Sequence, residues 1–176
     1  MIKYLLIALV VLMVVSPLLW LRQTPGQARI TAFRNRALQL GLKVQMVPRA
    51  DADPADRQPD AVRYLKPLVP DSRGAMPVMD HSWILLRDPR RGRESPFPGW
   101  RWFRDEAPAA IHPAIAACLR ELPESVGALR ADGQGLSAYW RETGTLDDVA
   151  RLARALDGLF PQLGPRGMLA AQDAPH

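Results

Sequence analysis

Residues that could carry out chemistry are few in this chain, and the first group is Asp80, His81 and Ser82. An acid, a histidine and a serine are the components of nucleophilic catalysis. These three are consecutive and precede a predicted strand, where adjacent side chains point to opposite faces, so they do not form a relay on their own. We therefore expect His81 to be structural and the chain to contain no catalytic residue.

His112 and Cys118 form a second group that could react or bind a metal. Their spacing is roughly 240° around a helix of about 3.6 residues per turn, so they do not share a face. Cys118 instead follows the helical spacing of Ile115 and Leu119, where a buried thiol acts as a small apolar side chain. A single cysteine also leaves too few thiolates for a zinc or iron–sulfur site, so we expect no metal and no cofactor.

Carboxylates are adjacent in sequence at two places, Asp105 with Glu106 and Asp147 with Asp148. The second pair lies in the first turn of a predicted helix, where the helix dipole stabilises acids. The first pair lacks a partner for general acid and base catalysis. Four aspartates in residues 48–60 resemble a calcium loop, but the central glycine and the bidentate glutamate are missing, so we expect a solvated loop.

The cluster that most suggests binding combines tryptophans with arginines. Its members are Trp83, Arg87, Arg90, Arg91, Arg93, Trp100 and Trp102. Such residues stack on nucleic-acid bases or settle at a lipid interface. Strand alternation offers a structural account, in which the tryptophans face the core and the arginines are solvated. We favour the structural account, keep contact with lipid or protein as the alternative, and expect no nucleic acid partner.

Hydrophobic periodicity predicts the elements that position these residues. The predicted strands cover residues 42–47, 61–68, 82–87, 100–104, 126–130 and 136–141. The predicted helices cover residues 27–40 and 110–122 and a last segment that begins after Thr145, where Asp148 completes a capping box. Residues 132–135, Asp-Gly-Gln-Gly, are a strong hairpin signal. Because the strands come in hairpins, we expect an α+β fold, a small two-layer domain of antiparallel hairpins and two to three helices.

The first fifty residues contain no Asp or Glu, and residues 4–21 carry no charge at all. A helix of this length spans roughly 27 Å, close to the bilayer core of about 30 Å. The sequence therefore predicts that the α+β domain follows an N-terminal transmembrane helix. A cleaved signal peptide is the alternative, but no small-x-small cleavage site follows the apolar segment.

Charge is distributed unevenly along the chain. Residues 1–50 hold seven basic groups, whereas residues 51–176 hold 16 basic and 18 acidic groups. The arginines that follow the predicted anchor indicate that the domain faces the cytoplasm and that the N-terminus lies outside. The high content of Arg, Ala and Leu against only three Lys indicates a bacterial protein, so the expected membrane is the bacterial inner membrane. They also suit contact with anionic lipid headgroups, but we favour the interpretation in which they only set topology.

Several stretches resemble an uncharacterised family of small single-pass inner-membrane proteins of gammaproteobacteria. They are residues 16–22 (SPLLWLR), 36–42 (RALQLGL), 100–104 (WRWFR), 122–123 (LP) and 138–142 (AYWRE). Some members of that family are labelled as relatives of YajC, the accessory subunit of the preprotein translocase. The resemblance implies a membrane protein without an assigned activity, and it carries over no catalytic residue.

The predicted organisation is a transmembrane anchor (1–23), a basic juxtamembrane helix (24–41), an α+β domain (42–162) and a disordered tail (163–176). We expect a membrane-anchored binding or accessory protein that scaffolds a membrane complex. Its expected partners are the lipid bilayer and a membrane protein. One alternative is a module that binds anionic lipid surfaces, and another is a membrane-bound enzyme of unknown reaction. The predicted lipid or partner contacts are Arg22, Arg29, Arg34, Arg36, Arg90, Arg91 and Arg93.

Overall fold

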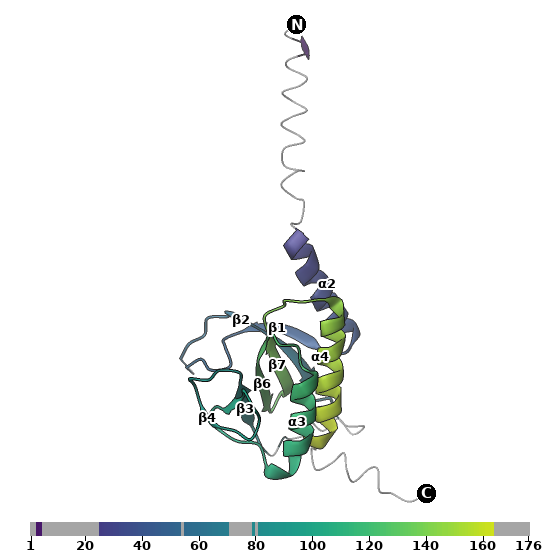
Figure 1. Ribbon diagram of the computed structural model, residues 1–176. Coiled ribbons are helices and arrows are strands. Elements are labelled where there is room, and N and C mark those ends of the chain that lie inside the picture. Colours follow the sequence, from purple (N-terminus) through teal and green to yellow (C-terminus); the bar gives the residue numbers. More distant parts are fainter. Residues whose placement is uncertain (1–2, 5–24, 54, 71–78, 80, 164–176) are drawn as a thin grey trace, which may run out of the picture. The chain divides into compact units, whose positions relative to one another are not determined.

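The computed structural model describes residues 3–4, 25–53, 55–70, 79 and 81–163 (Figure 1). Its contacts divide the chain into two compact units, Met1–Ala32 and Phe33–His176. Helix α2 (Pro25–Gln39) begins in the first unit, and its residues 33–39 belong to the second. The second unit also contains the sheet and the remaining helices of the described residues.

The second unit is built on one antiparallel sheet of seven strands within the described residues. In chain order they are β1 (Lys43–Val47), β2 (Ala61–Pro67), β3 (Trp83–Leu86), β4 (Arg93–Glu94), β5 (Arg101–Trp102), β6 (Val126–Asp132) and β7 (Gly135–Trp140). Their order across the sheet is β1-β2-β7-β6-β3-β5-β4. Strand β7 is an interior strand, and all six of its residues are buried.

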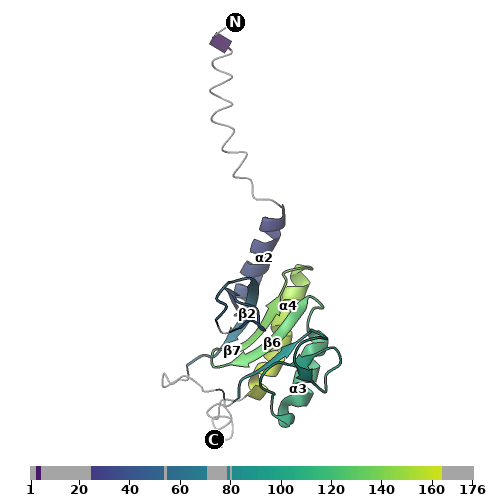
Figure 2. The ribbon, with the colours of Figure 1, turned by 90° about the vertical axis from the view of Figure 1, so that its left-hand side faces the viewer.

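Helices α3 (His112–Glu121) and α4 (Leu146–Leu159) lie side by side against one face of the sheet (Figures 1 and 2). Short 3-10 helices precede α3 (η1, Ala109–Ile111) and follow α4 (η2, Phe160–Leu163). Helix α4 starts as the sequence predicts, because the Asp148 carboxylate accepts the backbone N–H of Thr145 at 2.8 Å. The main core fills the space between these helices and the sheet.

Alternation along the strands gives the sheet two different faces. On β7, Leu136, Ala138 and Trp140 belong to the main core on the helix side. Tyr139 points the other way and belongs to a smaller apolar cluster. The other buried members of that cluster are Ala50, Ile84, Leu86 and Ala128. We call the side of the sheet that carries this smaller cluster the open face.

The predicted fold class needs correction. The structure has an α+β fold with a seven-stranded antiparallel sheet and three α-helices in its described part, but none of these helices combines the length and hydropathy that crossing a bilayer requires. The prediction of an N-terminal transmembrane helix is therefore wrong for the fold described. Except for residues 3–4, the predicted anchor at 1–23 lies outside the described residues, as do residues 164–176 of the predicted tail.

The predicted strands and helices of the domain are confirmed to within a few residues at their ends. The pairing of residues 82–87 with 100–104 is also confirmed, since Leu85 pairs with Trp102. Trp83, Trp100 and Trp102 are buried, which confirms the structural account of the tryptophans. The predicted hairpin at residues 132–135 joins β6 to β7.

We predict that Gly135→Ala destabilises the domain by roughly 2–3 kcal/mol. Gly135 has φ +135°, and a Cβ there would fall on the backbone carbonyl oxygen of Lys66. Gly133 in the same turn is the matched control, because a Cβ there meets no atom within 4 Å. Urea unfolding of the two variants should show a large loss for position 135 and a change within about 0.5 kcal/mol for position 133. Equal effects would contradict this description of the turn.

Candidate functional site

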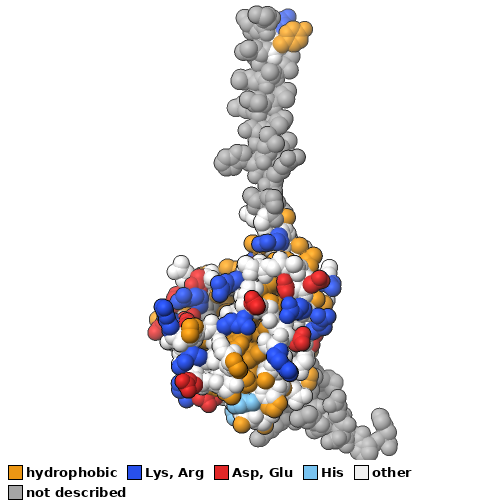
Figure 3. All heavy atoms as spheres, viewed as in Figure 1, with side chains coloured by type: hydrophobic (Ala, Val, Ile, Leu, Met, Phe, Trp, Pro, Cys, Tyr) orange, Lys and Arg blue, Asp and Glu red, His pale blue; other side chains and the backbone are white. Residues whose placement is uncertain are grey.

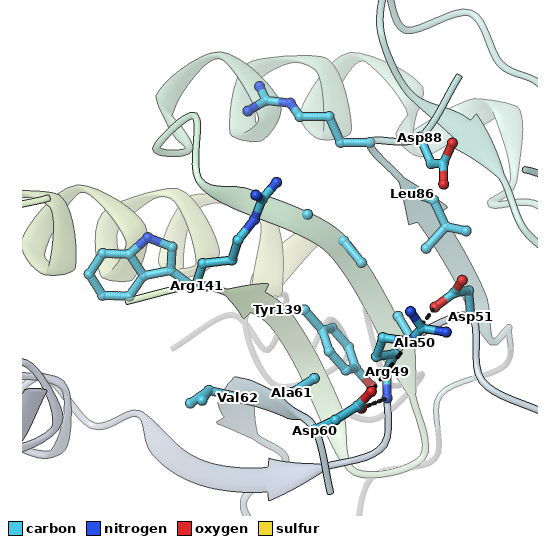
Figure 4. A pocket seen from close by; sticks show the side chains of 14 residues that line it. Arg49, Ala50, Asp51, Asp60, Ala61, Val62, Leu86, Asp88, Tyr139 and Arg141 are labelled. Atoms are coloured by element: carbon cyan, nitrogen blue, oxygen red, sulfur yellow. Dashed lines mark hydrogen bonds and ion pairs between the residues drawn. The ribbon is translucent and has the colours of Figure 1, made fainter. Parts of the chain in front are cut away.

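A pocket of about 600 Å³ opens on the open face (Figure 4). Four neighbouring strands contribute to it: the start of β2, the end of β7, the start of β6 and the end of β3. Residues 49–51, from the segment between β1 and β2, form a further wall. The volume lies in the range of sites that hold small molecules or a few amino-acid side chains.

The floor of the pocket is apolar. Leu86, Ala128 and Tyr139 line it and are buried members of the open-face cluster. Gly127 also lines it, at a register shift between Val126 and Ala128. A Cβ at Gly127 would meet no atom within 4 Å, so the floor has room where a side chain is absent.

One corner of the pocket holds charges that compensate one another. The Nε atom of Arg49 lies 3.6 Å from the Asp51 carboxylate and 3.5 Å from that of Asp60. Asp60 also accepts the backbone N–H of Arg49 at 3.1 Å, and Arg91 forms a further ion pair with Asp51. This corner is therefore satisfied internally and fixes the segment after β1.

Two other charges on the pocket wall are not compensated in this way. Among the described residues, the guanidinium of Arg141 has no ion pair and no hydrogen-bond acceptor, and its side chain is exposed. Asp88 accepts the backbone N–H of Arg90 at 2.8 Å and forms no ion pair with any described residue. Figure 4 shows Arg141 and Asp88 on different sides of the pocket. A cation and a carboxylate thus remain available to a ligand.

Arg87, the third arginine on the pocket wall, is held in place by its own contacts. Its backbone N–H donates to the Gly127 carbonyl at 2.8 Å, and its guanidinium donates to the Glu124 carbonyl at 2.5 Å. The guanidinium carbon also lies 5.0 Å from the centroid of the Trp100 ring, within cation–π range. These contacts keep Arg87 at the rim between β3 and β6.

A buried network closes the open face beside the pocket. Arg63, which pairs with Tyr139 across β2 and β7, donates from Nε to Gln45 Oε1 at 3.1 Å. Its guanidinium lies 3.7 Å from the Asp132 carboxylate, which also forms an ion pair with Arg130 Nε at 2.9 Å. Buried charges are tolerated when they are paired and hydrogen-bonded, and none of the residues in this network lines the pocket.

Glu142, the residue after Arg141, lies on the opposite face of the sheet, where it forms a buried network. Glu142 is only 6% exposed, and its two carboxylate oxygens each accept a hydrogen bond from Arg34 at 2.8 Å. The Tyr64 hydroxyl donates to the same carboxylate at 2.9 Å. Burial raises the pKa of Tyr64 above its ordinary value, and the hydrogen bond to Glu142 raises it further. This network holds residues 33–39 of α2 against the end of β7.

The predicted contact residues near the N-terminus have different environments. Arg22 lies outside the described residues, and Arg29 lies in the first unit on α2. Arg34 forms the bidentate pair with Glu142, which raises the pKa of its guanidinium. Arg36 is exposed and donates to the Gln39 side chain at 3.3 Å. The structure therefore gives Arg34 and Arg36 separate partners.

The predicted contact residues between β3 and β5 are mostly ion-paired. Arg91 pairs with Asp51 at the pocket corner, and Arg93 pairs with Glu106 at 3.1 Å. Arg90 is exposed. Figure 3 shows Lys and Arg side chains interspersed with Asp and Glu on the face in view. Sequence reasoning missed Arg141 and Glu142, because no motif distinguishes these residues from other strand-end charges.

The histidine and cysteine of α3 have structural surroundings. His112 Nε2 lies 3.1 Å from the Ala107 carbonyl oxygen, and its ring contacts Phe97 and Trp102. Cys118 is buried, and this burial raises the pKa of its thiol to about 12. Within the described residues, no group of three or more His, Cys, Asp or Glu side chains is arranged to hold a metal ion.

Comparisons with protein-family models, with curated proteins and with solved structures find no match to this chain. The resemblance to an inner-membrane family therefore stays a prediction. The pocket and its charges are the observations from which a function is inferred.

We predict that Arg34→Gln lowers the free energy of unfolding by about 2 kcal/mol, because it leaves the buried Glu142 carboxylate without its charged partner. Arg36→Gln removes the same charge from the same helix at an exposed position, and its effect should stay within about 0.5 kcal/mol. Urea unfolding of both variants measures the difference. A loss for Arg36→Gln as large as that for Arg34→Gln would show that helix charge, rather than the Glu142 contact, is responsible.

Proposed function

We propose that this domain is a binding module that takes a segment of a partner polypeptide in the pocket of its open face. The observation that carries the proposal is Arg141, an exposed cation without an ion-pair partner among the described residues, beside an apolar floor. A surface that joins an apolar floor to a few polar groups is typical of binding sites. An accessory role in a protein complex follows from such a site.

The composition of the pocket favours binding over catalysis. Its described lining contains Arg, Asp, Tyr and apolar residues, and no His, Cys, Ser or Lys. Nucleophilic catalysis needs an activated nucleophile beside a base, and Asp51 and Asp60 are already engaged with arginines. The pocket therefore supplies recognition groups more readily than a reacting pair.

The shape of the pocket favours a polypeptide ligand. The site crosses four adjacent strands, which are about 4.8 Å apart in a sheet, so an extended segment fits across them. The apolar floor suits one side chain of that segment, and the charged rim suits polar groups on either side. The lipid-surface alternative has less support, because Arg34, Arg91 and Arg93 are already paired with acidic side chains.

Site-specific photocrosslinking in cells tests this proposal. The photoreactive residue p-benzoylphenylalanine replaces Asp60, whose side chain is 44% exposed at the pocket rim, and in a matched control it replaces Leu146, which is 48% exposed at the start of α4. We expect a discrete adduct from position 60 and none from position 146.

A pocket-filling variant completes the test. Gly127→Leu puts a side chain into the free space over the floor, so it should remove the adduct formed at position 60 while the protein stays folded. An adduct that survives Gly127→Leu, or that forms equally from position 146, would contradict binding in the pocket, as would the absence of any adduct.

A further inference from the structure

We infer that the ligand of this pocket is a mixed-charge polypeptide segment, in which an acidic side chain binds Arg141, an apolar side chain lies on the floor and a basic side chain binds Asp88. This inference rests on the proposed function and adds the chemistry of the ligand. It is carried by the two charges on the pocket wall that have no ion pair with any described residue.

The acidic side chain is assigned to Arg141 because of the chemistry of the guanidinium group. Its parallel N–H donors match a carboxylate in a bidentate arrangement, as Arg34 and Glu142 show elsewhere in this domain. The backbone N–H of Arg141 donates to the Ser125 carbonyl at 3.4 Å, so the strand end is fixed while the side chain is exposed.

The basic side chain is assigned to Asp88 by the same reasoning. One Asp88 oxygen accepts the backbone N–H of Arg90, and a carboxylate has further acceptor positions for an ammonium or guanidinium group. The nearest arginine in sequence, Arg87, is directed to the Glu124 carbonyl and the Trp100 ring instead. Asp88 therefore has capacity for a cation from outside the chain.

The separation of the two charges sets the spacing of the ligand. Arg141 follows β7 and Asp88 follows β3, and only β6 lies between these strands, so their backbones are about 10 Å apart. In an extended segment, residues i, i+2 and i+4 share a face and span about 13 Å. At these three positions an acidic, an apolar and a basic residue reach Arg141, the floor and Asp88. The segment's span of about 13 Å exceeds the backbone separation of about 10 Å by a length that the long Glu, Lys and Arg side chains can bridge.

The test uses purified protein and defined peptides in isothermal titration calorimetry. The probe is acetyl-Glu-Ser-Leu-Ser-Lys-amide, together with the same residues in reverse order, because the structure does not fix the chain direction. We expect one of the two to bind, with at least a tenfold loss when its Glu is replaced by Gln. Arg141→Gln should cause the same loss for the Glu peptide and none for the Gln peptide.

The second charge is tested in the same way. Replacing the peptide Lys by Gln should weaken binding to the parent protein and leave binding to Asp88→Asn unchanged. Arg90→Gln is the control, because it removes an exposed guanidinium that does not line the pocket. Circular dichroism of each variant confirms that it is folded.

The outcomes separate the two proposals. If neither peptide binds, or if Glu and Gln peptides bind alike, the mixed-charge inference is wrong, while a pocket-dependent crosslink at position 60 would leave the proposed function standing. If the dipeptide of Glu and Lys binds as tightly as the pentapeptide, the site binds a small zwitterion, and the inference that its ligand is a polypeptide segment is wrong. Unchanged binding of the peptide to Gly127→Leu would place it outside the pocket and overturn the mixed-charge inference, whereas an adduct at position 60 that survives Gly127→Leu would overturn the proposed function.

Discussion

Alternation along the interior strand β7 is the constraint on which the rest of this domain depends. Trp140 packs against Phe33 and Tyr64 on the helix side, with ring centroids 5.3 Å apart in both pairs. Tyr139, one residue earlier, belongs to the open face. A shift of one residue in the pairing of β7 would exchange these environments and bury charges without partners. The Gly135 turn and the bond from Trp140 Nε1 to Ser125 Oγ, at 2.6 Å, hold this register.

The residues that follow β7 show that charges on the two faces of the sheet have different environments. Glu142 is buried, and a buried carboxylate is costly unless it is paired and hydrogen-bonded, which Arg34 and Tyr64 provide. Arg141 stays in contact with water, so it needs no internal partner. The helix face is therefore closed by internal pairing, whereas the open face keeps a charge for recognition. We regard this difference as the physical origin of the proposed binding site.

Local patterns in the sequence predict much of the fold. The hairpin at residues 132–135 and the capping box of Thr145 and Asp148 depend on near neighbours, and both were predictable. Cys118 was placed in the core by its helical spacing. The candidate site was not predictable, because its wall combines five segments that are separated in sequence. The contact of Arg34 with Glu142 on the helix face was not predictable either, because 108 positions separate the two residues. The transmembrane part of the predicted fold class was wrong, since no helix among the residues that the structure describes combines the length and hydropathy needed to cross a bilayer.

A residue-resolved NMR titration tests the central claim most directly, that the open face is the working side of the sheet. Backbone amide resonances would be followed while acetyl-Glu-Ser-Leu-Ser-Lys-amide, or its reversed sequence, is added to the parent protein. The account predicts that the largest shifts fall at Gly127, Ala128 and Arg141, with little change along α3 and α4. Shifts concentrated on those helices, or no shifts at millimolar peptide, would contradict it.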